Sequence, residues 1–419
     1  MNPPIISSEF PLLIAFGAFM IGSTLMAQGQ SITNQPDSAA LALASDSGFD
    51  GKLTGGWEGE RQRLEQKGIS FNAQLVLEGF GNATGGVDTG VTGASTFDLN
   101  LALDAAKAFN WQGGEFYADL EDHAGRNPST ALAGDLQVFD KLNSDSYLQI
   151  FELWYQQELF NGWLRLKAGK IDANTEFSVI DNGLPFLNAS TQVTPTILPF
   201  PTTPDPMPGV NLFFTPAKAW YASFGVFYAN RSDTFGDLTG HPQSIQPTAS
   251  GTLLIAETGL RWDQAPVLGA DGNFKVGVWG HTGTYERLQG GRQNGSGGYY
   301  AVFDQTLWHP AGKPDQGART FLEAGHAQPS VSAIAWNTTG GLTWTGLFAD
   351  DDVLGFSANY AHLSPDAGLP HSFELALEGL YQVSVSKWAT VMPDFQFIIH
   401  PGGQYPDAAV GTLDLTIQF

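Results

Sequence analysis

The sequence of 419 residues has no cysteine and few basic residues. Without cysteine, a disulfide framework, a thiolate nucleophile and a thiolate metal site are all excluded. Lys and Arg number 19 against 42 Asp and Glu, so the clustered positive charge that nucleic-acid binding needs is missing. No apolar run of about eighteen residues or more follows residue 30, which argues against a membrane-spanning helix.

The sequence also lacks the residue spacing of a catalytic or metal site. Its eight histidines include no close pair of the type that holds a zinc ion. The aspartates at 350–352 are explained by a polar turn between strands. The glycine-rich run 295–298 has no phosphate-loop lysine and is expected to be a loop. We therefore expect no enzymatic activity, no cofactor and no metal ion.

Residues 1–27 are expected to be a secretory signal peptide. Residues 11–21 form an apolar core that is too short to remain as a membrane span, and small residues around Ala27 supply a cleavage point. Residues 1–10 hold no Lys or Arg, which departs from the usual basic start of such a signal. The pattern nevertheless favours export.

Two short segments lie between this signal and the periodic part of the chain. Residues 28–52 are rich in Ser, Ala and Gln without periodicity, so they are expected to be disordered. Residues 53–68 are expected to form a linker with a short helix. Charged and amide residues occupy 58–67, and Gly68 follows as a stop signal.

From residue 69 onward, apolar and polar residues alternate with a period of two. The stretch 411–419 shows this pattern without a break and ends at Phe419. A strand with this period has one apolar and one polar face. Most of the segments with this pattern approach the ~9–11 residues that a tilted membrane strand needs. The sixteen predicted strands are 69–81, 95–109, 113–124, 147–160, 162–173, 209–215, 219–231, 252–264, 272–284, 299–309, 318–327, 336–348, 352–363, 371–386, 388–400 and 409–419.

The lengths of the connections distinguish a barrel from a sandwich. Connections after odd-numbered strands are long, as in 125–146, 174–208 and 285–298, and those after even-numbered strands are usually short, as in 216–218. A soluble sandwich would use Greek-key connections without this alternation. The sequence therefore predicts an all-β fold, a 16-stranded antiparallel transmembrane β-barrel over 69–419 with a short N-terminal periplasmic helix.

If the aliphatic face of each strand meets lipid, the other face lines a lumen. Its charged side chains cannot be dry, because an unpaired buried charge costs too much free energy. Water is therefore expected to fill a bore that sixteen strands make wide enough for small solutes. The candidate channel-lining residues from this pattern are Glu152, Trp154, Arg165, Lys167, Glu257, Arg261 and Trp279.

The pattern leaves the solute open. Polar side chains can exchange hydrogen bonds with sugar hydroxyls, and Trp154 and Trp279 can stack on the apolar face of a sugar. A polar but unselective wall explains the pattern equally well, and an acidic bore disfavours phosphate and other anions. The proline-rich insert 174–208 cannot be a strand. Folding into the bore and capping it from outside are equal alternatives for this insert.

Several stretches resemble the carbohydrate-selective porins, the OprB-type family of Gram-negative outer membranes. The resemblance covers about residues 53–419. The stretches that carry it are 53–71, 152–157, 166–177, 300–305, 341–355 and 393–403.

The resemblance implies a sixteen-stranded porin of the bacterial outer membrane that passes mono- or oligosaccharides. It also implies a constriction of Arg and Glu side chains with aromatic neighbours, for which the matching positions are Arg126, Glu152, Trp154 and Lys167. Phe419 matches the terminal aromatic residue that such barrels present to the barrel-assembly machinery. Outer-membrane lipid and a homotrimer are further implied partners, with a monomer equally compatible. The alternatives are a general or cation-preferring porin and, less favoured, a hydrolase or an adhesin on the same scaffold.

Overall fold

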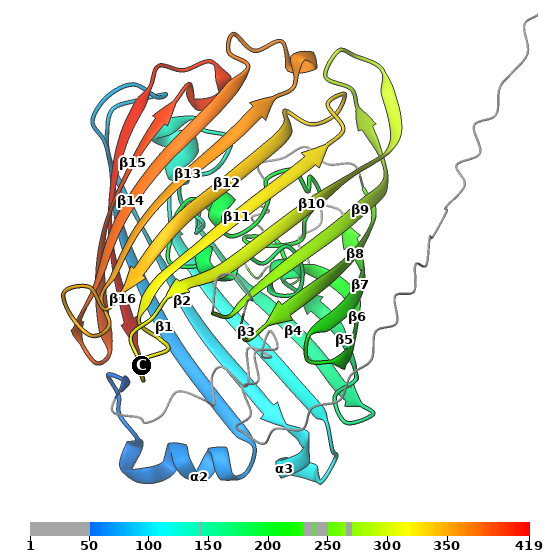
Figure 1. Ribbon diagram of the computed structural model, residues 1–419, viewed down its shortest axis with the longest axis vertical. Helices are drawn as coiled ribbons and strands as arrows, with labels where there is room; N and C mark the ends of the chain where they lie inside the picture. The colour runs from blue at the N-terminus through cyan, green and yellow to red at the C-terminus, as the bar shows by residue number, and fades with distance from the viewer. Residues whose placement is uncertain (1–50, 143, 230–235, 237, 239–249, 265–269) are drawn as a thin grey trace, which may run out of the picture. The chain divides into compact units, whose positions relative to one another are not determined.

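The computed structural model describes residues 51–142, 144–229, 236, 238, 250–264 and 270–419. In these residues, sixteen strands form one closed barrel in which every strand pairs antiparallel with its neighbours in sequence and β1 pairs with β16 (Figure 1). The predicted fold class is confirmed. The signal peptide 1–27 and almost all of segment 28–52 lie outside the described residues. The strands are β1 (Ile69–Asn82), β2 (Gly90–Asp104), β3 (Gly114–Gly125), β4 (Tyr147–Leu159), β5 (Leu164–Ile171), β6 (Met207–Ala217), β7 (Trp220–Ala229), β8 (Gly251–Trp262), β9 (Gly272–Glu286), β10 (Arg292–Trp308), β11 (Gly317–Ala327), β12 (Ile334–Thr345), β13 (Val353–Leu363), β14 (Phe373–Ser386), β15 (Ala389–Ile399) and β16 (Ala408–Gln418).

Several predicted strand boundaries are wrong, and two of the differences have a clear local cause. Residues 105–109 were expected to continue the second strand, but they form the helix α3 (Ala105–Phe109), because the Asp104 side chain accepts hydrogen bonds from the N–H groups of Ala106 and Lys107. The glycine-rich run 295–298 was expected to lie in a loop, but it belongs to β10. A shift of register between Asn294 and Ser296 accommodates these residues in the sheet.

The predicted amino-terminal helix is present. Helix α2 (Glu60–Gln66) follows a 3-10 turn, η2 (Trp57–Gly59), and ends before Gly68. Gly68 has a φ of +85°, and a Cβ there would lie 2.6 Å from the carbonyl oxygen of Asp104, so only glycine fits this stop. Among the described residues, no helix is long and apolar enough to cross a membrane.

The two ends of the barrel differ in their connections. The helix end carries α2 and the short turns 218–219 and 387–388, while the opposite end carries the connections 126–146 and 172–206. The expected long–short alternation fails at several places, most clearly between β8 and β10. There the connection 287–291 at the opposite end is shorter than 263–271 at the helix end, because β9 and β10 extend further than predicted.

Side chains on the strands alternate between the two surfaces of the barrel as predicted. Leu99, Leu153 and Val278 are exposed on the outward surface, as expected of a surface that meets lipid. Asp119 and Glu323, on the same set of strands, are buried on the inward surface. The period-two pattern of the sequence therefore places the polar faces toward the interior.

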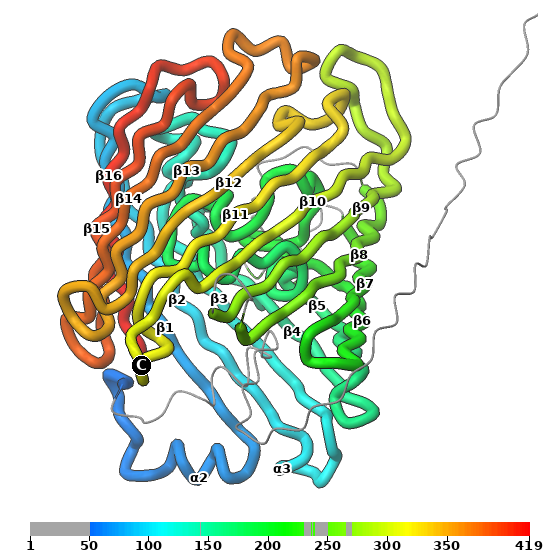
Figure 2. The backbone as a smooth tube through the Cα atoms, viewed as in Figure 1, coloured from blue at the N-terminus to red at the C-terminus, as the bar shows by residue number. Residues whose placement is uncertain are grey.

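The insert between β5 and β6, residues 172–206, lies inside the barrel (Figures 1 and 2). It contains the 3-10 turns η4 (Ala173–Thr175), η5 (Asp181–Gly183) and η6 (Ala189–Thr191). Turn η5 contacts β10 to β12, and η6 contacts β12 and β13. Of the two alternatives for this insert, the structure shows the inward one.

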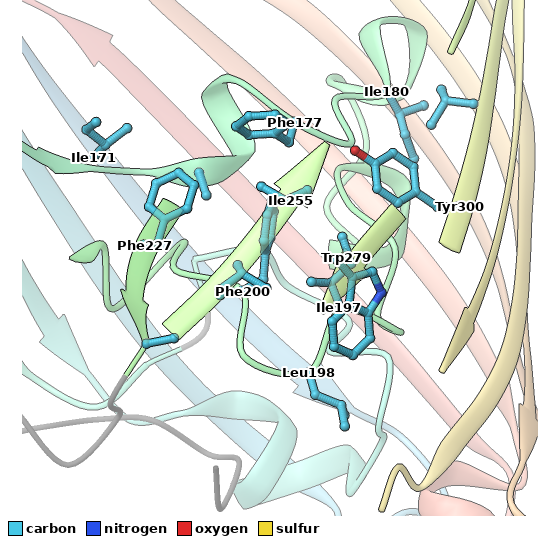
Figure 3. Packing of buried hydrophobic residues seen from close by; sticks show 14 of the residues in the cluster. Ile171, Phe177, Ile180, Ile197, Leu198, Phe200, Phe227, Ile255, Trp279 and Tyr300 are labelled. Atoms are coloured by element: carbon cyan, nitrogen blue, oxygen red, sulfur yellow. The ribbon is translucent and has the colours of Figure 1, made fainter. Parts of the chain in front are cut away.

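The insert packs against an apolar part of the inward surface. Phe177, Ile180 and Phe200 of the insert lie in one buried cluster with Phe227 and Ile255 of the wall (Figure 3). The sequence pattern predicts polar inward faces, but on this side of the barrel the inward surface is apolar. Burying these side chains against one another offsets the entropy lost when a segment without regular structure becomes ordered.

Glycines on neighbouring strands make room for the aromatic rings of this surface. A Cβ at Gly277 would lie 2.1 Å from Cζ of Tyr300, and one at Gly341 would lie 2.6 Å from Cζ of Phe321. Both glycines are therefore needed for space. Each ring lies over the neighbouring strand at its glycine.

Candidate functional site

The candidate site lies where β4 and β5 meet the start of the insert. The period of two places Trp154 of β4 and Arg165 and Lys167 of β5 on the inward surface, where all three are buried. The insert returns toward them through turn η4, which begins at Asp172. The Asp172 side chain accepts a hydrogen bond from the N–H of Asn174 at 2.8 Å and so starts this turn.

Turn η4 presents Glu176 to both cations. The two carboxylate oxygens of Glu176 accept hydrogen bonds from Nη1 and Nη2 of Arg165 at 3.0 and 2.6 Å. Lys167 Nζ forms a second ion pair with the same carboxylate. This bidentate pairing fixes the start of the insert against β5. We call Trp154, Arg165, Lys167 and Glu176 the β5 group.

The charges of the β5 group hold the pKa of Glu176 far below its usual range. Burial alone raises this pKa, but Arg165 and Lys167 outweigh burial and bring it to about 2. For Asp172, four residues earlier, burial dominates and raises the pKa to about 6 despite the hydrogen bond from Asn174. The pKa values of these two carboxyl groups are therefore shifted in opposite directions from their usual values.

Aromatic rings flank both cations. Lys167 Nζ lies 4.1 Å from the centroid of the Trp154 ring, which stacks on Tyr117 with the centroids 4.9 Å apart. The guanidinium of Arg165 lies 4.3 Å from the ring centroid of Phe213. These cation–π contacts compensate cations that are partly removed from water.

Some polar atoms beside the β5 group have no protein partner. They are Nε1 of Trp154 and both side-chain atoms of Asn211, which is cross-strand neighbour to Lys167. Buried polar atoms of this kind usually bond to water or to a ligand. The site can therefore offer a solute the indole N–H of Trp154 and the side-chain amide of Asn211, which has two N–H donors and one carbonyl acceptor.

Two predicted residues hold the insert and do not belong to the β5 group. Glu257 of β8 accepts hydrogen bonds from the N–H of Ser178 at 2.9 Å and from the hydroxyls of Tyr221 and Tyr300 at 2.6 and 2.7 Å. Glu152 of β4 accepts one from the N–H of Asp172 at 2.8 Å. The structure places both carboxylates as anchors of the insert backbone.

Carboxylates elsewhere on the wall hold the insert in the same way. Asp304 of β10 accepts a hydrogen bond from the N–H of Asn182 at 2.8 Å. Glu378 of β14 accepts one from the N–H of Leu187 at 2.7 Å. With Glu152 and Glu257, these anchors are distributed around the barrel, so the insert is fixed along its length.

The remaining predicted residues lie in three different places. Arg261 of β8 stacks over Tyr221, with its guanidinium carbon 4.6 Å from the ring centroid. Trp279 of β9 is buried in the apolar cluster beneath the insert. Arg126 is exposed on the β3–β4 connection and is not part of the β5 group. The structure thus brings together Trp154, Arg165 and Lys167.

Sequence reasoning did not select Glu176, Phe213 or Asn211. Glu176 lies in the non-periodic insert, where parity gives no direction, although it falls within the family-like stretch 166–177. Asn211 and Phe213 lie on β6 and share the inward parity of that strand, so the period of two could have found them. Among the described residues, no group of three or more His, Asp or Glu side chains is arranged to hold a metal ion.

Comparison with known proteins gives a consistent result. Residues 88–419 match the family described as "Carbohydrate-selective porin, OprB family". Porin B of Pseudomonas aeruginosa is 23% identical over 418 residues, covering 87% of this chain and 90% of that protein. The structure of Pseudomonas putida OprB at high pH is similar with a TM-score of 0.79 at 20% identity, covering 89% of this chain and 99% of that one. The low-pH structure of the same protein gives a TM-score of 0.61 at 18% identity, covering 89% of this chain and 100% of that one.

Proposed function

Because the chain belongs to the carbohydrate-selective porin, OprB family and is an outer-membrane porin, we propose that mono- or oligosaccharides diffuse through its lumen past the β5 group. The observation that carries this proposal is the juxtaposition of Trp154, Lys167 and Glu176 with unpartnered polar atoms beside them. Sugars present alternating hydroxyls and apolar C–H faces. A wall that places aromatic side chains beside fixed donors and acceptors fits that chemistry.

Planar-bilayer recording of the full-length protein tests the proposal. We expect stepwise conductance that falls as glucose or a maltooligosaccharide is added. Trp154→Ala removes the indole ring with its unpartnered N–H and is expected to weaken sugar block by about 1 kcal/mol, or roughly fivefold in half-blocking concentration. Trp308→Ala, at an exposed position at the end of β10, is the matched control. Conductance that no sugar reduces would contradict the proposal.

A general or cation-preferring porin is the second candidate. It would pass small solutes by size alone, so liposome swelling with sugars of rising mass separates it from a sugar-selective channel. A hydrolase is disfavoured because the hydroxyl–imidazole contacts among the described residues are enclosed. Thr96 and His123, for example, lie 2.9 Å apart and are both almost fully buried.

The sequence supports further parts of the proposal. Residues 1–27 are removed as a signal peptide, and α2 within the linker 53–68 lies in the periplasm. Phe419 engages the barrel-assembly machinery. The exposed aliphatic surface contacts outer-membrane lipid and leaves room for a homotrimer. Amino-terminal sequencing of the mature protein and its mass in native detergent complexes test these parts.

A further inference from the structure

The strands on one side of the barrel contain no Lys or Arg. Strands β12 to β16 and β1 to β4 are neighbours around the barrel, and none of them contains Lys or Arg. Their inward surface carries several carboxylates that do not hold the insert backbone. One of them, Glu374, accepts hydrogen bonds from the N–H groups of Leu136 and Gln137 in the β3–β4 connection. We call six others the carboxylate wall: Glu78, Asp98, Asp119, Glu121, Asp394 and Asp414.

The carboxylates of this wall face mainly one another. Glu78 and Asp414 are direct cross-strand neighbours, and Asp98 and Glu121 are as well. Glu78 also meets Asp140 of the β3–β4 connection. When two carboxyl groups are in contact, ionisation of both is disfavoured. Such a pair shares one proton and carries one negative charge.

Within the part of the chain that the structure describes, no cation is in direct contact with these carboxylates. Among the described residues, none of the six forms an ion pair with Lys, Arg or His within 4.0 Å. Lys141, whose charge acts on Glu78 and Asp414, donates its ammonium group to the carbonyl of Leu184. Lys170, whose charge acts on Asp119, donates to Gln149 and to the carbonyl of Ile150. The wall therefore has more negative charge than the protein balances.

A second feature of the wall indicates a missing donor or cation. Thr412 lies between the two aspartates, directly across from Asp394 and two residues before Asp414. Its hydroxyl oxygen is without a hydrogen-bond partner although the residue is only 5% exposed. Neither oxygen of Glu78 receives an N–H or O–H from the described residues. Such oxygens can accept hydrogen bonds from a solute or contact a cation.

On the opposite side, three inward cations are paired with carboxylates. Arg165 and Lys167 share Glu176, and Lys275 pairs with Asp181 at 3.1 Å. Lys170 donates hydrogen bonds to Oε1 of Gln149 and to the carbonyl of Ile150. An anion that approaches one of the three paired cations would have to displace its carboxylate. An entering cation meets unbalanced carboxylates.

We propose that the carboxylate wall concentrates hydrated monovalent cations and makes the lumen selective for neutral and cationic solutes, amino sugars among them, over sugar acids and sugar phosphates. The inference deepens the proposed function and rests on it. No preformed metal centre is present in the described part of the chain, so the cations keep their water and exchange freely.

Reversal potentials in a KCl gradient, measured on the full-length protein in planar bilayers, test this inference. A charged wall of one sign raises the local concentration of counter-ions by about tenfold or more, so we expect K⁺ to permeate about ten times better than Cl⁻. The double variant Glu78→Gln with Asp414→Asn is expected to move the ratio toward one. Asp351→Asn, on an exposed turn at the helix end, removes one carboxylate that is not part of the wall. This variant is expected to leave the ratio unchanged.

Sugar readouts on the same channels separate the two proposals. Glucosamine is expected to block the wild-type current at lower concentration than glucose, and gluconate at higher concentration. Block by glucose with a K⁺ to Cl⁻ ratio of one or less overturns the inference and leaves the proposed function intact. A cation-selective current that no sugar blocks overturns the proposed function alone. If the double variant fails to insert, Asp119→Asn provides an independent removal of charge from the wall.

Discussion

The two sides of the lumen solve the problem of inward charge differently. On the insert side, β5 to β11, cations and carboxylates neutralise one another, as in the pairing of Arg165 and Lys167 with Glu176. On the carboxylate wall, like charges such as Glu78 and Asp414 face each other. On the insert side, removing a carboxylate leaves a buried cation without its counter-ion. On the carboxylate wall, removing a carboxylate breaks no ion pair. One side of the lumen therefore fixes the insert through ion pairs, and the other carries carboxylates that are not paired with a cation.

Removing a carboxylate from each side is expected to give the largest difference. Glu176→Gln leaves Arg165 and Lys167 without their counter-ion, and breaking a buried ion pair in this way costs about 3–5 kcal/mol. Glu78→Gln removes a like-charge contact and is expected to leave stability unchanged or slightly higher. The temperature at which the folded band converts to the unfolded band in unboiled gel samples compares the two. Equal losses for both variants would contradict the comparison.

Adding one methyl group to each side is expected to have a smaller effect. Gly277→Ala places a Cβ 2.1 Å from Tyr300, which must leave Glu257, at a cost of about 1–3 kcal/mol. Gly79→Ala on β1 meets no atom within 4 Å and is the matched control. Unfolding in urea from detergent or lipid measures the difference. If Gly79→Ala lowers the free energy of unfolding as much as Gly277→Ala does, the effect comes from the strand backbone and not from the space that Tyr300 needs.

The smallest expected effect is a pH dependence within the start of the insert. The folded pKa of Glu176 is about 2 and lies below its unfolded value, so its contribution to stability is present above about pH 5 and is lost as the pH falls toward 2. The folded pKa of Asp172 is about 6 and lies above its unfolded value, so its contribution is present below about pH 4 and is lost as the pH rises through 6. Lowering the pH from 7 to 5 should therefore stabilise the wild type more than Asp172→Asn. A wild-type curve parallel to that of the variant would contradict this assignment.

The sequence pattern was sufficient for the barrel because the period of two is a local property. The alternation of polar and apolar residues within a strand identifies its inward face. Trp154, Arg165 and Lys167 could therefore be placed in the lumen without knowledge of their neighbours. The same local signal failed at 105–109, where a side-chain cap on Asp104 outweighed the strand pattern, and at 295–298, where a bulge tolerated glycine within β10.

The partners of these residues could not be predicted, because they come from a segment without periodicity. Glu176 and Ser178 are positioned by 3-10 turns and by wall carboxylates far away in sequence, such as Glu257. For the same reason Trp279 was expected to meet solute, although the insert covers its side of the wall. Arg126 was assigned from family likeness alone, and its exposed place on a connection follows from no strand pattern.

The seam between β1 and β16 has a consequence for how the chain is made. Gln418 donates a hydrogen bond to Gln74 at 2.6 Å, and 344 positions separate these two residues in the sequence. Until translation has delivered β16, β1 presents an open edge that other chains can join, which is a known route to aggregation. Such distant pairing is also slow to form. The polypeptide must therefore stay protected from self-association until its two farthest strands meet.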